Sequence, residues 1–291
     1  MLITVFTPTY NRGRLLRPLF ESLCGQAFDS FEWLIVDDGS TDDTKDIVNG
    51  FCKAGNHFPI RYVQQENLGK HQAINRGVAE AKGEYFFIVD SDDRLPVNAL
   101  QKVAQRIQTI NGDPSLGGVC GLDATFDGTV IGTGFPEAEM DDTALNIRFL
   151  HHVMGDLKEV FRTDVLREFP FPSIDGERFC PEALVWNRIA TKYKLRCINE
   201  IIYLVEYQTD GISSNIVKVR MQSPVASMLC YQELTTYNVP VMVKIKAAIN
   251  YWRFRLCAKR ESARPSLRWY WNWTMPLGYL MHLRDKLKIE S

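Results

Sequence analysis

The stretch Tyr85–Asp93, with the sequence YFFIVDSDD, joins an apolar run directly to three carboxylates. The apolar and aromatic residues predict a buried strand, and Asp90, Asp92 and Asp93 follow at its end. Such an acidic cluster is costly unless something positive compensates its charge. A divalent cation on the carboxylate oxygens, shared with a diphosphate, is the simplest candidate. A solvated turn with helix-capping aspartates is the alternative.

Strand and helix patterns alternate around this stretch over the first 120 residues. Short apolar runs predict strands, and apolar residues at helical spacing predict helices. The expected strands cover residues 2–7, 31–36, 60–64, 85–89 and 118–122, and the expected helices cover 12–26, 42–54, 70–81 and 97–110. This alternation indicates crossover connections and a parallel sheet.

The pattern becomes less regular after residue 123. Residues 123–142 are expected to form a loop or hairpin, 159–162 a short strand, 181–194 a helix and 196–207 a further strand. From about residue 216 onward the pattern is helical.

Polar residues follow three of the expected strands at the point where each one ends. They are the segments 8–11 (PTYN), 37–40 (DDGS) and 90–93 (DSDD). Because ligands of parallel sheets bind outside the carboxyl ends of the strands, one shared crevice is favoured over three unrelated turns. The first segment would seat a flat heterocycle, and a carboxylate of the second would accept hydrogen bonds from a base or a ribose. An ordinary capped turn is the alternative for each.

Residues 67–77, with the sequence NLGKHQAINRG, predict a turn followed by a helix. A helix N-terminus favours a nearby phosphate, and Lys70 and Arg76 would add positive charge. A loop with a solvated helix face is the alternative.

Composition is that of a folded protein, with 45% hydrophobic and 24% charged residues among 291. This length suits one large α/β domain with an appendage, or two small domains. The net charge of −1 argues against a general nucleic-acid binder. Seven dispersed cysteines without a C-x-x-C pair fit free thiols in a reducing cytoplasm. Neither a secretory signal nor a membrane-spanning helix is expected from the apolar patterning.

The C-terminal region is basic and aromatic. Residues 242–291 hold eleven lysines and arginines against three acidic residues, and four of the six tryptophans lie in this part of the chain. Amphipathic aromatic side chains beside basic ones are typical of segments that lie on a membrane surface. The pattern therefore predicts membrane contact through residues 249–288. A helical pair that packs on the catalytic domain is the alternative.

In combination, the segments resemble the family 2 glycosyltransferases, which are inverting enzymes with the GT-A fold. The matching residues are TPTYNR at 7–12, VDDGSTD at 36–42, NLGK at 67–70 with Ala73, Asn75 and Gly77, and VDSDD at 89–93. The resemblance implies an α/β fold with a Rossmann-like mixed sheet flanked by helices. It implies a catalytic domain over 1–215, divided into a nucleotide-sugar half (1–115) and an acceptor half (116–215), and a helical extension over 216–291.

The resemblance also implies roles for individual residues. The donor would be a nucleotide sugar, most often a uridine diphosphate sugar, with Asp38 binding the uracil ring. Asp92 would bind Mn²⁺ or Mg²⁺ at the diphosphate. The remaining nucleotide-binding positions would be Thr7, Pro8, Thr9 and Tyr10 around the base, with Asn67, Lys70, Asp90 and Ser91.

Glu182 aligns with the catalytic base of the family, although Pro181 replaces the usual first acid and Glu replaces Asp. Glu182 at a helix N-terminus without a catalytic role is the alternative, and Asp175 and Glu177 are further candidates for the base. Asp210 stands where many relatives have a third metal ligand.

His151 and His152 are neighbours in sequence and point apart, which argues against joint metal binding. Contact with the acceptor is the role left open for either.

These inferences predict a cytoplasmic glycosyltransferase, peripheral on the inner face of the membrane. It would move a hexose or N-acetylhexosamine to a glycan or lipid-linked acceptor in surface polysaccharide assembly, without a nucleic-acid partner. The alternatives are a catalytically silent nucleotide-sugar-binding protein at the membrane and a nucleotidyltransferase. The latter would usually need a Gly-rich loop after the first strand, which residues 8–11 lack.

Overall fold

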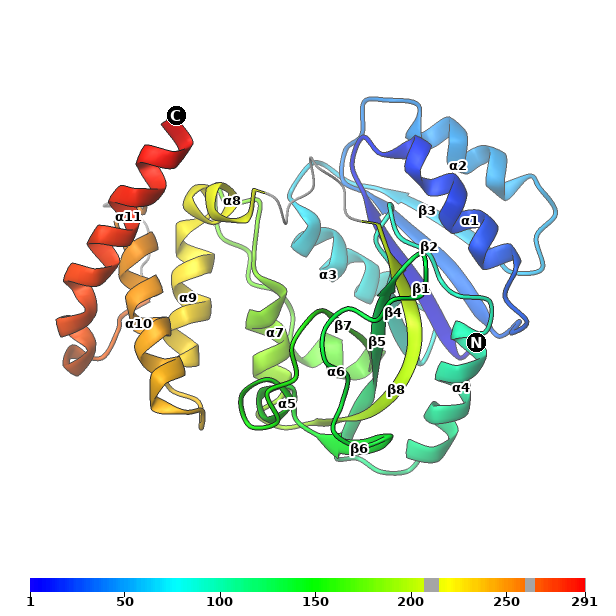
Figure 1. Cartoon of the computed structure of the whole chain (residues 1–291). Helices are drawn as coiled ribbons and strands as arrows, with labels where there is room; N and C mark the ends of the chain where they lie inside the picture. Colours follow the sequence, from blue (N-terminus) through cyan, green and yellow to red (C-terminus); the bar gives the residue numbers. More distant parts are fainter. Residues whose placement is uncertain (207–214, 260–264, 291) are drawn as a thin grey trace. The chain divides into compact units, whose positions relative to one another are not determined.

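The computed structural model describes residues 1–206, 215–259 and 265–290 (Figure 1). The chain forms two compact units. The first comprises Met1–Pro170 with Lys192–Gln208, and the second comprises Phe171–Thr191 with Thr209–Ser291. The domain boundary after residue 215 stays a prediction.

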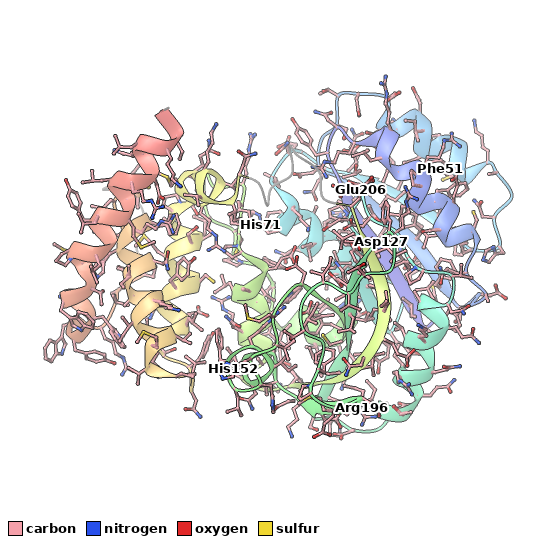
Figure 2. All side chains as sticks on the ribbon, viewed as in Figure 1. Phe51, His71, Asp127, His152, Arg196 and Glu206 are labelled. Atoms are coloured by element: carbon pink, nitrogen blue, oxygen red, sulfur yellow. The ribbon has the colours of Figure 1, made fainter. Side chains whose placement is uncertain are left out.

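The first unit is built on an eight-stranded mixed sheet with the strand order β3-β2-β1-β4-β7-β5-β8-β6. Its strands are β1 (Ile3–Thr9), β2 (Phe31–Asp37), β3 (Ile60–Gln64), β4 (Tyr85–Ile88), β5 (Leu116–Thr125), β6 (Glu139–Asp142), β7 (Leu157–Arg162) and β8 (Lys194–Val205). Strands β6 and β7 run antiparallel to their neighbours, whereas the other six share one direction. Six strands therefore end at one edge of the sheet, called the carboxyl edge below. Figure 2 shows Glu206, just past the end of β8, at the carboxyl edge and Arg196, near the start of β8, at the opposite edge.

Helices cover both faces of the sheet (Figure 1). Helices α1 (Leu16–Cys24), α2 (Thr44–Cys52) and α4 (Ala99–Ile110) bury their apolar sides in one large core with alternate residues of the sheet, among them Val5, Trp33 and Phe87. The short 3₁₀ turn η1 (Gly13–Leu15) precedes α1, and α5 (Ala144–Phe149) follows β6. Helix α3 (Lys70–Glu80) lies on the other face, beside α6 (Thr163–Glu168).

Coverage on both faces explains the near-continuous apolar runs of the central strands. Every residue of β1, β2 and β4 is buried. On the face below α3, the rings of Phe6 and Phe86 stack with their centroids 4.9 Å apart. The predicted α/β fold with a mixed sheet and flanking helices is confirmed.

The second unit is helical within the residues that the structure describes. Its helices are α7 (Glu182–Ile189), α8 (Ile216–Gln222), α9 (Pro224–Leu234), α10 (Val241–Arg255), the 3₁₀ segment η2 (Trp269–Thr274) and α11 (Met275–Glu290). Helix α11 approaches α10 closely at Gly278, where a Cβ atom would lie 2.5 Å from the Cβ of Trp252. The Arg253 guanidinium also pairs with Asp285 across the two helices, at 2.8 Å from Nη2 to Oδ1. None of the described helices is long and apolar enough to cross a membrane.

Gly77 sets how closely α3 lies on the sheet, because a Cβ atom there would stand 2.2 Å from the Phe6 ring. Phe6 is fully buried and held against Phe86, so the ring has no room to move away. We therefore predict that Gly77→Ala lowers the free energy of unfolding by about 1–3 kcal/mol through overpacking. Gly50 in α2 is the matched control, because a Cβ atom there meets nothing within 4 Å.

At Gly50, the change to alanine should raise the free energy of unfolding by about 0.5–1 kcal/mol, as in any exposed helix interior. Denaturant unfolding of the two variants measures both effects. Equal changes at the two positions would contradict the packing assigned to Gly77.

Candidate active site

The loops that follow β1 and β2 are tied together at the carboxyl edge. The backbone N–H of Asn11 donates to the Ser40 hydroxyl at 2.8 Å, and the Asn11 side-chain oxygen accepts from the N–H of Thr41 at 2.8 Å. Asn11 has a φ of 52°, a left-handed conformation that asparagine tolerates better than most residues. These bonds fix the segment that carries Arg12.

Asp38 holds the loop that leads into α3. Its carboxylate is buried and accepts hydrogen bonds from the backbone N–H groups of Leu68 and Gly69, at 2.9 and 2.7 Å, and from the Gln65 side chain at 2.8 Å. Lys70 follows as the first residue of the helix. Asp38 therefore positions Lys70 through the protein backbone, and its contact with a uracil ring stays a prediction.

Residues 7–10 form the end of β1 and differ in their surroundings. The Thr7 hydroxyl accepts a hydrogen bond from the Trp33 indole N–H at 2.9 Å, and both Thr7 and Pro8 are buried. The Thr9 hydroxyl oxygen is also buried but has no hydrogen-bond partner among the described residues. Tyr10 is 47% exposed. A buried hydroxyl without a partner is costly, so this strand end suits a polar ligand.

The remaining two nucleotide-binding candidates lie in turns at the same edge. Asn67 is half-buried in the loop that Asp38 holds, and its backbone nitrogen would lie 3.0 Å from a Cβ atom at Gly39. Gly39 has a φ of 84°, which an L side chain rarely adopts, so this close approach requires glycine. Ser91 is buried in the turn after β4.

Two of the carboxylates after β4 are paired with cations from other segments. The ammonium of Lys70 lies 2.8 and 2.9 Å from the two carboxylate oxygens of Asp90, and the guanidinium of Arg12 lies 2.7 Å from Asp92. Burial raises the pKa of Asp90, but Lys70, Lys158 and Arg12 outweigh burial and leave this pKa below its ordinary value. Asp90 is therefore ionised at neutral pH.

The third carboxylate joins the turn to the end of β8. The Tyr203 hydroxyl accepts from the backbone N–H of Asp90 at 2.9 Å and donates to the Asp93 carboxylate at 2.7 Å. The other oxygen of Asp93 accepts from the N–H of Glu206 at 3.1 Å. Burial, and next the charge of Asp90, raises the pKa of Asp93 to about 7. Tyr203 was missed by sequence reasoning, because an aromatic residue in a strand predicts core packing alone.

The carboxylates after β4 suit a cation that a substrate also helps to bind. Among the described residues, no group of three or more His, Cys, Asp or Glu side chains could hold a metal ion, and Asp210 lies outside the described residues. Mg²⁺ in proteins is usually held by one or two carboxylates together with substrate phosphates and water. Asp90 and Asp92 can supply such a pair, whereas a closed cage of protein ligands is not built from the described side chains.

Glu182 belongs to the second unit, where it is the first residue of α7. Trp186 lies one turn further along the helix and packs edge-on against Phe171, with ring centroids 5.9 Å apart. The helix is anchored by Arg188, which donates to both carboxylate oxygens of Glu233 at 2.9 and 2.6 Å. Glu182 thus lies at the start of a helix whose last turn is anchored by an ion pair.

The two further candidates for the base differ in whether their carboxylates are already engaged in hydrogen bonds. Both carboxylate oxygens of Glu177 accept backbone hydrogen bonds from the start of α9, from Val225 at 2.7 Å and Ala226 at 2.8 Å. Glu177 therefore has a structural role as a helix cap. Asp175 is exposed in the same loop.

The two adjacent histidines have different surroundings within the first unit. The Nε2 atom of His151 lies 2.8 Å from a carboxylate oxygen of Asp142, and His152 is exposed with a φ of 56°. Contact of either side chain with an acceptor stays a prediction.

Comparison with known proteins identifies the family of the chain. The sequence model described as "Glycosyl transferase family 2" matches residues 4–123. The glycosyltransferase GlyG of Streptococcus pneumoniae is 30% identical over 227 residues, which cover 72% of each chain. A Campylobacter jejuni protein named GalNAc(5)-diNAcBac-PP-undecaprenol beta-1,3-glucosyltransferase is 33% identical over 104 residues, covering 36% of this chain and 34% of its own.

Solved structures agree on the fold. TarS of S. aureus (residues 1–349), crystallised with UDP, matches with a TM-score of 0.63 at 21% identity, over 89% of this chain and 73% of that one. The mannosyltransferase PcManGT of Pyrobaculum calidifontis, in complex with GDP-Man and Mn²⁺, matches with a TM-score of 0.57 at 18% identity, over 98% and 75%. The chain belongs to glycosyltransferase family 2 and has the GT-A fold.

Proposed function

We propose that this glycosyltransferase moves one sugar from a uridine diphosphate sugar to an acceptor hydroxyl, with inversion at the anomeric carbon. The observation that carries this proposal is the pairing of Asp90 with Lys70 and of Asp92 with Arg12 at the carboxyl edge. Carboxylates for a cation and cations for a diphosphate come together there. The UDP bound in the related TarS structure supports uridine as the base.

Different residues of the carboxyl edge would bind the base and the diphosphate of the donor. The base would lie at Tyr10 and the unpartnered hydroxyl of Thr9, and the diphosphate near Lys70 and Arg12. Asp92 would hold Mn²⁺ or Mg²⁺ together with the diphosphate, and Asp90 would lie beside it, near the ribose. Such a cation, when bound, neutralises the charge that develops on the departing nucleoside diphosphate.

Glu182 would act as the general base. Its carboxylate takes the proton from the acceptor hydroxyl while that oxygen forms a bond to the anomeric carbon. The bond from this carbon to the diphosphate breaks on the opposite face, so the configuration inverts. Glu177 caps a helix and is a poorer candidate for this task.

The acceptor would be a glycan or a lipid-linked glycan in surface polysaccharide assembly. The undecaprenol-linked acceptor in the name of the Campylobacter relative supports this class. Exposed apolar residues of the second unit support a lipid-linked acceptor independently, because they suit contact with a membrane and such an acceptor lies at a membrane. The protein would then be peripheral on the inner face of the membrane.

The tryptophans in the described part of η2 and α11 differ in their exposure. Trp271 is 9% exposed, whereas Trp269 and Trp273 are 81% and 57% exposed. Leu280 and Leu287 of α11 are likewise exposed, by 61% and 71%. The exposed basic residues Arg284 and Lys286 lie on the same helix. Exposed aromatic and aliphatic side chains beside basic ones suit the headgroup region of an anionic bilayer.

Asp92→Asn should reduce kcat/KM at least about 100-fold, because the change removes a charge that stabilises the cation at the diphosphate. The assay measures release of nucleoside diphosphate from a panel of nucleotide sugars with Mn²⁺ and acceptor. Asp43→Asn, in an exposed turn after β2, is the control and should leave the rate unchanged. Full activity of Asp92→Asn would refute the cation site, and a wild type that releases no diphosphate from any donor would favour the silent binder.

Glu182→Gln should lower kcat by about 10²–10⁴-fold, since the amide cannot accept the acceptor's proton, while the affinity for UDP stays within twofold. Turnover and calorimetric titration with UDP measure the two quantities. Asp175→Asn, in the exposed loop before α7, removes a further candidate for the base and should retain turnover if Glu182 is the base. If Glu182→Gln weakens UDP binding and keeps kcat, Glu182 is a binding residue and the base lies elsewhere.

The double variant Trp273→Ser/Leu280→Ser should bind vesicles at least about tenfold more weakly than the wild type, because each buried apolar side chain contributes roughly 1.5–3 kcal/mol. Co-sedimentation with vesicles of phosphatidylglycerol and phosphatidylcholine measures binding. Leu150→Ser is the control, since Leu150 is 64% exposed in the first unit. Equal vesicle binding by all three proteins would exclude this surface, and a change of mass in light scattering would point to self-association.

A further inference from the structure

Asp123 is a buried carboxylate to which neither the family motifs nor the mechanism above gives a role. It lies near the carboxyl end of β5 and is 3% exposed. One of its carboxylate oxygens, Oδ1, is buried and has no hydrogen-bond partner among the described residues. An ionisable oxygen buried in this way costs free energy comparable to a lost hydrogen bond or more.

The surroundings of Asp123 are those of the active site. Its partner in the register of the neighbouring strand is Tyr203, whose hydroxyl binds Asp90 and Asp93. Burial raises the pKa of Asp123 to about 6; the charges of Lys158 and Asp90 also reach this carboxyl, the first lowering its pKa and the second raising it. Asp123 therefore lies within electrostatic range of the carboxylate that pairs with Lys70.

Among the described residues, no cation forms an ion pair with Asp123. Lys158 and Arg148 are the cations whose charges reach this carboxyl. The Lys158 ammonium lies 3.6 Å from the centroid of the Tyr203 ring, and Arg148 donates to the backbone carbonyl of Val153 at 3.2 Å. The backbone carbonyl of Asp123 accepts from Ile131 at 2.9 Å, but this bond leaves the side chain free to act. A purely structural carboxylate would be expected to have both oxygens bonded.

We propose that Asp123 accepts a hydrogen bond from a hydroxyl group of the sugar that is transferred. This inference rests on the proposed function. The donor sugar follows directly after the diphosphate, and Asp90, whose charge reaches Asp123, would lie beside that diphosphate. A carboxylate that is acceptor-only suits a hydroxyl donor, so Asp123 would discriminate between sugars with and without that hydroxyl.

The test measures the contribution of the sugar to binding separately from that of the nucleotide. Calorimetric titrations measure the affinities of wild type and Asp123→Ala for UDP, which has no sugar beyond the ribose, and for UDP-glucose, UDP-galactose and UDP-N-acetylglucosamine. We expect the affinity for UDP to stay within twofold. For the sugar nucleotide that binds best to the wild type, affinity should fall about 10- to 100-fold, as for a hydrogen bond to a charged group.

Two comparisons exclude a structural explanation. Asp127→Ala removes an exposed carboxylate four residues further along, labelled in Figure 2, and should change neither affinity. Deoxy analogues of the best donor, each lacking one sugar hydroxyl, test the wild type without any substitution. One of them should bind the wild type about 10- to 100-fold more weakly than the parent donor, and bind Asp123→Ala as well as the parent does.

The outcomes distinguish this inference from the proposed function. If UDP and UDP-sugar affinities fall together in Asp123→Ala, or neither falls, Asp123 has a structural role and the inference is overturned while the function stands. The same holds if Asp123→Ala does not fold and no deoxy analogue binds the wild type more weakly. A wild type that binds no nucleotide sugar overturns both.

Discussion

The compensation of negative charge after β4 is the constraint on which the first unit depends. Asp90 and Asp92 come from one short turn, yet the cations that pair with them come from α3 and from the loop after β1. Partly buried carboxylates without such partners would be strongly unfavourable. The two ion pairs therefore require three segments, distant in sequence, to end at the same edge of the sheet.

The same requirement explains why other polar residues of this edge form hydrogen bonds that fix its loops. The Asp38 carboxylate accepts two backbone N–H groups immediately before Lys70, and Asn11 and Ser40 join the two loops beside Arg12. Each cation thus reaches its aspartate from a segment that is already held. Such preorganisation is what a site needs if it is to receive a charged ligand without rearranging.

The first half of the fold could be predicted from the sequence, because buried parallel strands are continuous apolar runs and the helices between them are strongly amphipathic. Segments that depend on distant partners could not be predicted. The strand β6 has the polar sequence EMDD and exists because β8 pairs with it, and the six-residue α5 and α6 are too short to show a period. At the site, the motif residues could be found from the sequence. The role of Tyr203 could not, because it depends on a register shift between β5 and β8. The capping role of Glu177 could not either, because the backbone N–H groups that it binds lie 48 and 49 residues further along the chain.

Three carboxylates at one edge, Asp90, Asp93 and Asp123, differ in pKa because their partners differ. Lys70 keeps Asp90 ionised, whereas burial raises the pKa of Asp93 to about 7 and that of Asp123 to about 6. Asp93 has both oxygens bonded to β8 and its end, so its raised pKa accompanies a structural role. Asp123 has a raised pKa and an unbonded oxygen, a combination that a structural role does not explain. Environments that separate the pKa values of neighbouring acids also separate their tasks, with ionised groups binding cations and buried ones binding hydroxyls or backbone.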